Sequence, residues 1–120
     1  MKIYVAGKYE ERRRIRRLMV ELENMGHTIS SDWTVHEMYH DLAVCAQEDY
    51  EGVRNCDALV AIVDIPLKYQ GLWVEVGLAL AWGKRVLLVG EFGESCIFSK
   101  LPWISKYPTI NDLLNHLVIK

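Results

Sequence analysis

Apolar positions along this chain alternate between continuous runs and helical stripes, a pattern typical of an α/β fold. Residues 58–64 (ALVAIVD) and 85–89 (RVLLV) are almost wholly apolar, as expected for parallel strands covered on both faces. Residues 2–6 (KIYVA) predict an earlier strand. Between these strands, residues 9–25 carry apolar side chains at helical spacing and predict a helix that ends at a glycine.

Weaker signals complete the alternation. Residues 27–31 predict a second strand, a polar connection follows it, and a helix then runs to about Cys56. A weak strand is expected near residues 103–104, and Thr109 is placed to cap a final helix. Strands and helices in this order predict a doubly wound, mostly parallel five-stranded sheet with helices on both faces. With 120 residues, 51% of them hydrophobic, we expect one domain spanning residues 1–120.

Composition narrows the classes of partner and compartment. The formal net charge is −2, which argues against binding to a nucleic acid polymer or an anionic membrane. Five arginines between residues 12 and 17 are interleaved with acidic residues and indicate a solvated helix face, with an arginine that reaches a substrate phosphate as the alternative. Three cysteines without CxxC spacing, no signal peptide and no membrane-spanning run predict a cytoplasmic protein.

One carboxylate stands out against its surroundings. Residues 72–82 (LWVEVGLALAW) are apolar or glycine except for Glu75, so the predicted helix is a buried one. An ionised carboxylate there needs a dedicated partner, or the amides and dipole of the helix N-terminus. A carboxylate fixed in a dry pocket suits a nucleophile, and the alternative is a core carboxylate with a purely structural hydrogen bond.

In sheets of this kind, ligands bind beyond the carboxyl ends of the strands. The segments expected there contribute the candidate substrate-binding residues Gly7, Lys8, Trp33, Asp64 and Gly71. Trp33, at a strand end, is the best candidate for stacking on a base. A single glycine after the first strand is not a dinucleotide fingerprint, and the chain has no P-loop, so we expect no cofactor.

Two blocks of the chain resemble the nucleoside 2-deoxyribosyltransferase family. The segment from residue 48 to 84 carries, in the family's order, Asp49, Gly52 with Val53, Asp57, and Gly71 before Glu75 and Gly77. The segment IYVAG at residues 3–7 is similar to the family's first strand, with its tyrosine at Tyr4. The similarity covers most of the chain.

The resemblance implies a flavodoxin-like (Rossmann-like) domain that cleaves the N-glycosidic bond of a nucleoside or nucleotide through a covalent sugar intermediate. Glu75 would attack C1′, the residue matched by Tyr4 would hold that carboxylate, and the one matched by Asp49 would donate a proton to the base. An oxocarbenium-like centre needs a nearby anion and a departing base needs a proton, so the residue chemistry suits these roles.

The chain also departs from the family. Residues 69–72 (YQGL) replace an acidic residue that the transferases carry before the glutamate, and Asp64 is the available substitute. The asparagine that a neighbouring subunit contributes in the transferases has no clear match in residues 96–103. A related branch hydrolyses nucleoside 5′-monophosphates and reads the phosphate with serines and an arginine. Its counterparts here would be Ser95, Ser99, Lys8 and Arg12.

Three further interpretations stay open at this point. Residues 36–40 (HEMYH) satisfy the HExxH pattern, which would make His36, Glu37 and His40 a zinc-hydrolase centre if a third ligand were present. A non-catalytic nucleotide-binding module would use the same crevice. Hydrolysis by water, rather than transfer to a second base, shares the first half of the mechanism. The apolar helices also predict a homodimer or a larger homo-oligomer.

Overall fold

The computed structural model describes residues 1–36, 41–93 and 96–118. Their core is a five-stranded, entirely parallel sheet with the strand order β2-β1-β3-β4-β5. The strands are β1 (Lys2–Ala6), β2 (Thr28–Ile29), β3 (Ala58–Ile62), β4 (Arg85–Val89) and β5 (Ser105–Tyr107). This doubly wound, flavodoxin-like arrangement confirms the predicted fold class.

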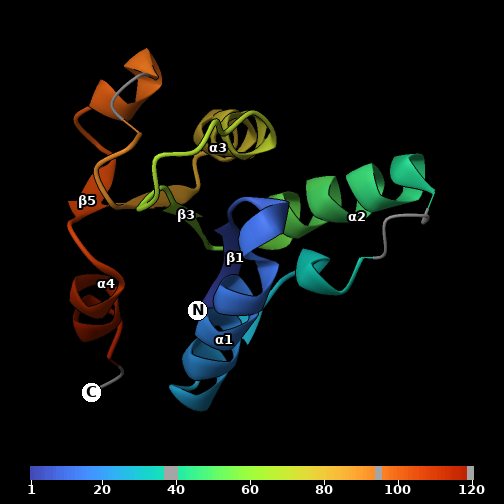
Figure 1. Cartoon of the computed structure of the whole chain (residues 1–120), viewed down its shortest axis with the longest axis horizontal. Helices are drawn as coiled ribbons and strands as arrows, with labels where there is room; N and C mark the ends of the chain where they lie inside the picture. The colour runs from blue at the N-terminus through green and yellow to red at the C-terminus, as the bar shows by residue number, and fades with distance from the viewer. Residues whose placement is uncertain (37–40, 94–95, 119–120) are drawn as a thin grey trace.

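Helices cover both faces of the sheet. Figure 1 shows α1 (Arg12–Asn24) and α4 (Ile110–His116) on one face, with α2 (Leu42–Asn55) and α3 (Gly71–Ala81) on the other. Three short 3₁₀ helices, η1 (Tyr9–Glu11), η2 (Trp33–Val35) and η3 (Ile97–Lys100), lie in the connections. No helix in the described ranges is long and apolar enough to cross a bilayer.

The central strands agree with the prediction, and the edge strands are shorter or displaced. All five residues of β3 are buried, as its apolar run predicts. Strand β2 holds only two residues rather than the five expected. Ser30 still donates its backbone N–H to the carbonyl of Ile3, and Ser31 packs against Gly52 of α2. The last strand begins at Ser105, since Ile104 donates its backbone N–H to the carbonyl of Leu101 in a turn instead of joining the sheet.

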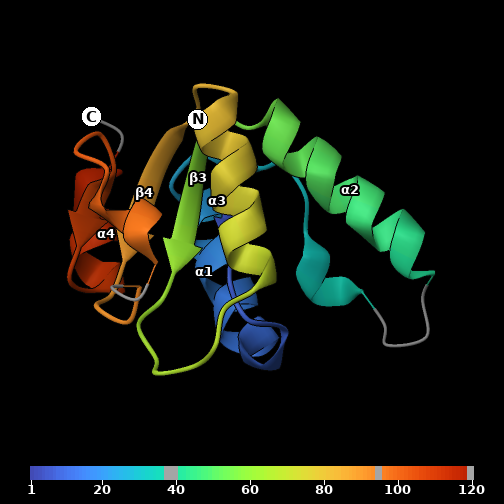
Figure 2. The same cartoon turned by 90° about the horizontal axis from the view of Figure 1, so that it is seen from above.

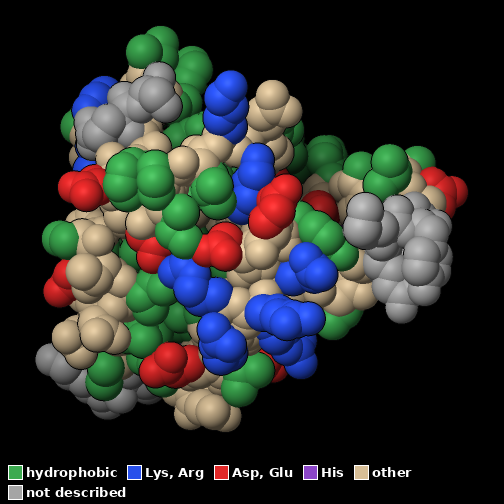
Figure 3. Space-filling view, in the orientation of Figure 1, with side chains coloured by type: hydrophobic (Ala, Val, Ile, Leu, Met, Phe, Trp, Pro, Cys, Tyr) green, Lys and Arg blue, Asp and Glu red, His purple; other side chains and the backbone are tan. Residues whose placement is uncertain are grey.

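The arginine-rich helix α1 packs through one stripe and exposes the other side. Its buried residues are Ile15, Leu18, Met19 and Leu22. Basic side chains gather over α1 with acidic side chains among them (Figure 3), which agrees with a solvated charged face. Two of these arginines are held by carboxylates at the sheet edge: Arg14 binds Asp64 and Arg16 binds Asp32.

The carboxyl ends of β3 and β4 are drawn tightly together. Gly90, immediately after β4, has φ +100°, and a Cβ atom there would collide with the backbone of Asp64. Asp64 accepts a two-pronged hydrogen bond from Arg14, with Nη1–Oδ2 and Nη2–Oδ1 distances of 2.8 and 2.7 Å. The pair ties the start of α1 to the sheet edge where ligands bind in this fold.

Candidate active site

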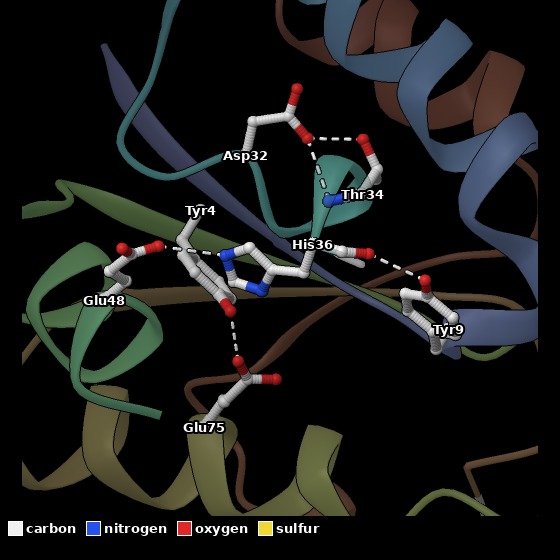
Figure 4. Close-up of polar contacts among 7 residues, drawn as sticks. All are labelled: Tyr4, Tyr9, Asp32, Thr34, His36, Glu48 and Glu75. Atoms are coloured by element: carbon white, nitrogen blue, oxygen red, sulfur yellow. Dashed lines mark hydrogen bonds and ion pairs between the residues drawn. The ribbon is translucent and has the colours of Figure 1, made fainter. Parts of the chain in front are cut away.

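Glu75 lies in the second turn of α3 and faces β1. The hydroxyl group of Tyr4 donates a hydrogen bond to Oε2 of Glu75 (Figure 4). The Tyr4 side chain is completely buried, and Gly52 of α2 packs directly on its ring, where a Cβ atom would lie 3.0 Å from Tyr4 Cδ2. Because the ring is clamped by the core, the hydroxyl group holds the carboxylate in one orientation.

Burial sets the protonation of this pair. Loss of solvent raises the pKa of Glu75 to about 7, an effect that the Tyr4 hydrogen bond opposes and the charge of Asp49 reinforces. Burial, followed by the nearby Glu75 charge, raises the pKa of Tyr4 well above its ordinary value, so the phenol remains a donor. Glu75 therefore changes its charge near neutral pH while its partner does not.

Asp49 extends from α2 into the same space. Burial raises the pKa of its carboxyl group to about 6, the charge of His36 opposes that rise, and Glu48 adds to it. Its Oδ1 atom is buried and has no hydrogen-bond partner among the residues described. A carboxyl group in this state holds a proton more tightly than an ordinary aspartate and is ready to share it with a ligand.

The two carboxyl groups line one cavity of about 650 Å³, within the usual range for a small-molecule site. Its walls come from the turn after β1, from η2, from α2 and from α3. Figure 2 shows the two helices α2 and α3 side by side. The lining residues are Gly7, Lys8, Tyr9, Glu10, Trp33, His36, Ala46, Asp49, Tyr50, Tyr69, Gln70, Gly71, Leu72, Val74, Glu75 and Leu78.

Four of the predicted substrate-binding residues lie in these walls. Gly7 must be small, because a Cβ atom there would collide with Ile15. The ammonium group of Lys8 donates to the backbone carbonyl of Lys68, and Gly71 begins the helix that carries Glu75. Trp33 is only 6% exposed, and its Nε1 donates to the backbone carbonyl of Val5 at 2.6 Å, so its ring packs as part of the cavity floor.

The remaining candidates lie elsewhere. Asp64 is bound to Arg14 and does not line the cavity. Ser99 is completely buried outside the cavity, and Ser95 falls outside the described residues. Arg12 stacks over the ring of Tyr9, with its guanidinium carbon 4.5 Å from the ring centroid, and its side chain does not line the cavity either. Among the suggested phosphate contacts that the structure describes, Lys8 alone is a cavity residue.

His36 is a cavity residue whose place in the site the sequence did not indicate. Its Nε2 lies 3.0 Å from Oε2 of Glu48, and its backbone carbonyl accepts a hydrogen bond from the Tyr9 hydroxyl group at 2.7 Å (Figure 4). In the HExxH pattern, only His36 is described, since Glu37 and His40 lie outside the described residues. Across the described ranges, no three His, Cys, Asp or Glu side chains are grouped to hold a metal ion.

Tyr50 and Gln70 also line the cavity without having been predicted to do so. Tyr50 follows Asp49 on α2, and its ring packs edge-on against Trp82 with centroids 5.1 Å apart. Gln70 directly precedes α3. The sequence could have suggested Tyr50 and Gln70 as cavity residues, because they are adjacent to Asp49 and Gly71 and a residue next to a site residue often lines the same cavity.

Removing the Tyr4 hydroxyl group tests whether it positions Glu75. We expect Tyr4→Phe to keep the fold, because the buried ring remains, and to lower kcat about 10- to 100-fold. The hydrogen bond favours ionised Glu75, so its loss should raise the pKa of Glu75 and make the loss of kcat/KM larger at pH 5–6 than at pH 8–9. Tyr107→Phe, on the far edge strand, is the control. A profile unchanged from wild type would show that the hydroxyl group does not tune the carboxylate.

The fold and the paired carboxyl groups place the chain in a class of small α/β proteins with a crevice at the carboxyl edge of the sheet. Residues 3–99 match the family model described as nucleoside 2-deoxyribosyltransferase. The chain therefore belongs to the nucleoside 2-deoxyribosyltransferase family, an enzyme family, as its sequence blocks predicted. No curated protein sequence matches the chain significantly.

Solved structures share the fold over nearly the whole chain. The CMP N-glycosidase BcmB of Clostridium botulinum is 22% identical, with a TM-score of 0.64 and 98% of each chain covered. A 2-deoxyribosyltransferase of the psychrotolerant bacterium Bacillus psychrosaccharolyticus is 20% identical, with a TM-score of 0.73 over 96% of this chain and 91% of that chain. A conserved protein from Enterococcus faecalis V583 is 21% identical, with a TM-score of 0.62 over 94% and 84%.

Proposed function

We propose that this chain cleaves the N-glycosidic bond of a 2′-deoxynucleoside or its 5′-monophosphate, with Glu75 as the nucleophile, and transfers the sugar to another base. The observation that carries the proposal is the Tyr4–Glu75 hydrogen bond at the wall of a cavity that also holds Asp49. Membership in the nucleoside 2-deoxyribosyltransferase family supports the same reaction class.

The first half-reaction needs one nucleophile and one acid. A carboxylate oxygen of Glu75 forms a bond to C1′ while the bond from C1′ to the base nitrogen breaks and its electron pair leaves with the base. Asp49 donates its proton to the departing base. In the second half, a base nitrogen attacks C1′, Asp49 takes up the proton of the attacking group, and the Glu75 carboxylate leaves.

Hydrolysis by water in the second half is the nearest alternative, and the CMP N-glycosidase among the structural neighbours is the observation that favours it. Incubating the protein with deoxynucleosides and their monophosphates, with and without a free acceptor base, separates the two. A new nucleoside that forms only with acceptor indicates transfer, and free base with sugar indicates hydrolysis. Binding without any product would favour a non-catalytic nucleotide-binding module.

An apolar surface supports the further proposal that the chain forms a homo-oligomer. The outward side of α3 and residues 97–103 leave large apolar side chains in solvent: Val74 is 66% exposed, Ile97 77%, Phe98 57% and Trp103 67%. Val74 lines the proposed active site and also an apolar groove of about 690 Å³ beside it. A second copy on this surface would shield the cavity mouth from water, as transfer requires.

The pKa values predict a bell-shaped pH dependence of kcat/KM. Glu75 must be ionised and Asp49 protonated, and their pKa values are about 7 and about 6, so kcat/KM should be highest between pH 6 and 7 and should fall on either side. Because the acid has the lower pKa, only a minor fraction of the molecules holds both required forms, even at the maximum. A profile that stays flat from pH 5 to 8 would contradict these roles.

A further inference from the structure

One end of the proposed active site is formed by the turn after β1, and its charges differ from those of a phosphate site. Lys8, Tyr9 and Glu10 line the cavity there. Glu10 is exposed, and it makes no hydrogen bond or ion pair with any residue described. Lys8 is the only lysine or arginine among the described cavity residues, so at this end one carboxylate offsets one ammonium group.

The catalytic groups orient a substrate along the cavity. Glu75 marks the position of C1′, and Asp49 on α2 marks the side on which the base leaves. Figure 4 shows Glu48, the neighbour of Asp49, and Tyr9 on opposite sides of the Tyr4–Glu75 pair. A substrate whose base lies on the α2 side would present the 5′ end of its sugar to the turn that carries Tyr9 and Glu10.

Of the three arginines at the start of α1, Arg12 and Arg14 are engaged elsewhere, and Arg13 is exposed and does not line the cavity. The guanidinium group of Arg12 lies over the ring of Tyr9. Arg14 binds Asp64 and also lies 3.4 Å from Glu11. The Lys8 ammonium group, for its part, already donates to the Lys68 carbonyl. Within the cavity, a 5′-phosphate dianion at this end would thus face an unpaired carboxylate beside one ammonium group that is already hydrogen-bonded.

We infer that Glu10 selects substrates with an uncharged 5′-hydroxyl group and disfavours 5′-phosphates. The inference rests on the proposed function and names its substrate class as unphosphorylated nucleosides. A hydroxyl group can donate a hydrogen bond to the Glu10 carboxylate, whereas a phosphate is repelled by it. Glu10 is thus a specificity residue in the turn after β1.

The test compares one deoxynucleoside with its own 5′-monophosphate, because the shared base isolates the 5′ group. Wild-type protein should give a kcat/KM at least about tenfold higher for the nucleoside. Glu10→Gln should raise the monophosphate-to-nucleoside ratio of kcat/KM about tenfold. Glu11→Gln is the matched control, since Glu11 is the adjacent residue, lies outside the cavity and should leave the ratio unchanged. A monophosphate preference in wild type, or an unchanged ratio in Glu10→Gln, would overturn the inference.

Calorimetry separates this inference from the proposed function. In Glu75→Gln, which retains the cavity without the nucleophile, the nucleoside should bind more tightly than the monophosphate, and adding Glu10→Gln should narrow the difference. Turnover of monophosphates alone would overturn the Glu10 assignment and leave the Glu75 mechanism standing. Nucleoside binding without Glu75-dependent turnover in the otherwise unaltered protein would overturn the mechanism and leave the selectivity standing. Binding of neither ligand would overturn both.

Discussion

Replacing Glu75 by glutamine should lower turnover about 10³- to 10⁵-fold while the protein stays folded. The amide keeps the shape of the side chain and can still accept the Tyr4 hydrogen bond, but it cannot attack C1′. Steady-state product formation from the best deoxynucleoside, followed by chromatography, measures the loss. Glu23→Gln, on the exposed side of α1, is the control for handling and folding.

Glu75→Gln should also change how the stability of the protein depends on pH. Glu75 has a pKa raised from 4.5 to about 7 in the folded protein, so the folded state binds more protons than the unfolded state between these values. The free energy of unfolding therefore falls as pH rises through that window. This destabilisation by ionised Glu75 reaches its full size above pH 7. Glu75→Gln removes this destabilisation, which is on the order of 1–3 kcal/mol, so the variant protein should have a Tm no lower than that of wild type at pH 8. Residual activity near wild type in this folded variant would remove Glu75 from the mechanism.

Replacing Asp49 by asparagine should slow cleavage about 10²- to 10⁴-fold for natural bases. Asparagine fills the same space, but it cannot supply a proton to the departing base. The loss should be much smaller for a base that leaves without protonation, because such a leaving group does not need the acid. Single-turnover rates with natural and activated bases measure the difference.

Glu51→Gln, on the same helix but outside the cavity, is the control for Asp49→Asn. The alkaline limb of the kcat/KM profile should also disappear in Asp49→Asn, since the group whose proton is lost near pH 6 is gone. Equal slowing of good and poor leaving groups would mean that Asp49 supports the site without donating a proton.

The central part of the fold could be predicted because its strands are long and buried on both faces. Strands β3 and β4 coincide with continuous apolar runs, which are typical of central parallel strands. The edge strands β2 and β5 hold two and three residues and are partly polar, so their short segments gave weak signals. Their bounds depend on turns and side-chain packing that local sequence does not specify.

Glu75 could be singled out from the sequence because a lone carboxylate in an apolar helix needs a partner. The partner itself, Tyr4, lies 71 positions away and was indicated only by the family resemblance. Asp64 was placed at the correct edge of the sheet, but helical periodicity does not show which arginine of α1 would reach it. Trp33 likewise occupies the expected strand end. Its hydrogen bond to Val5 and its burial depend on tertiary packing, which the local sequence does not specify.

The most direct test of the account is the mass of the intact protein, quenched in acid during turnover of a deoxynucleoside. We expect a population heavier by one deoxyribosyl group, with the addition mapped to the peptide that contains Glu75 and absent from Glu75→Gln. Turnover at full rate with no adduct at any quench time, or an adduct on another residue, would contradict it.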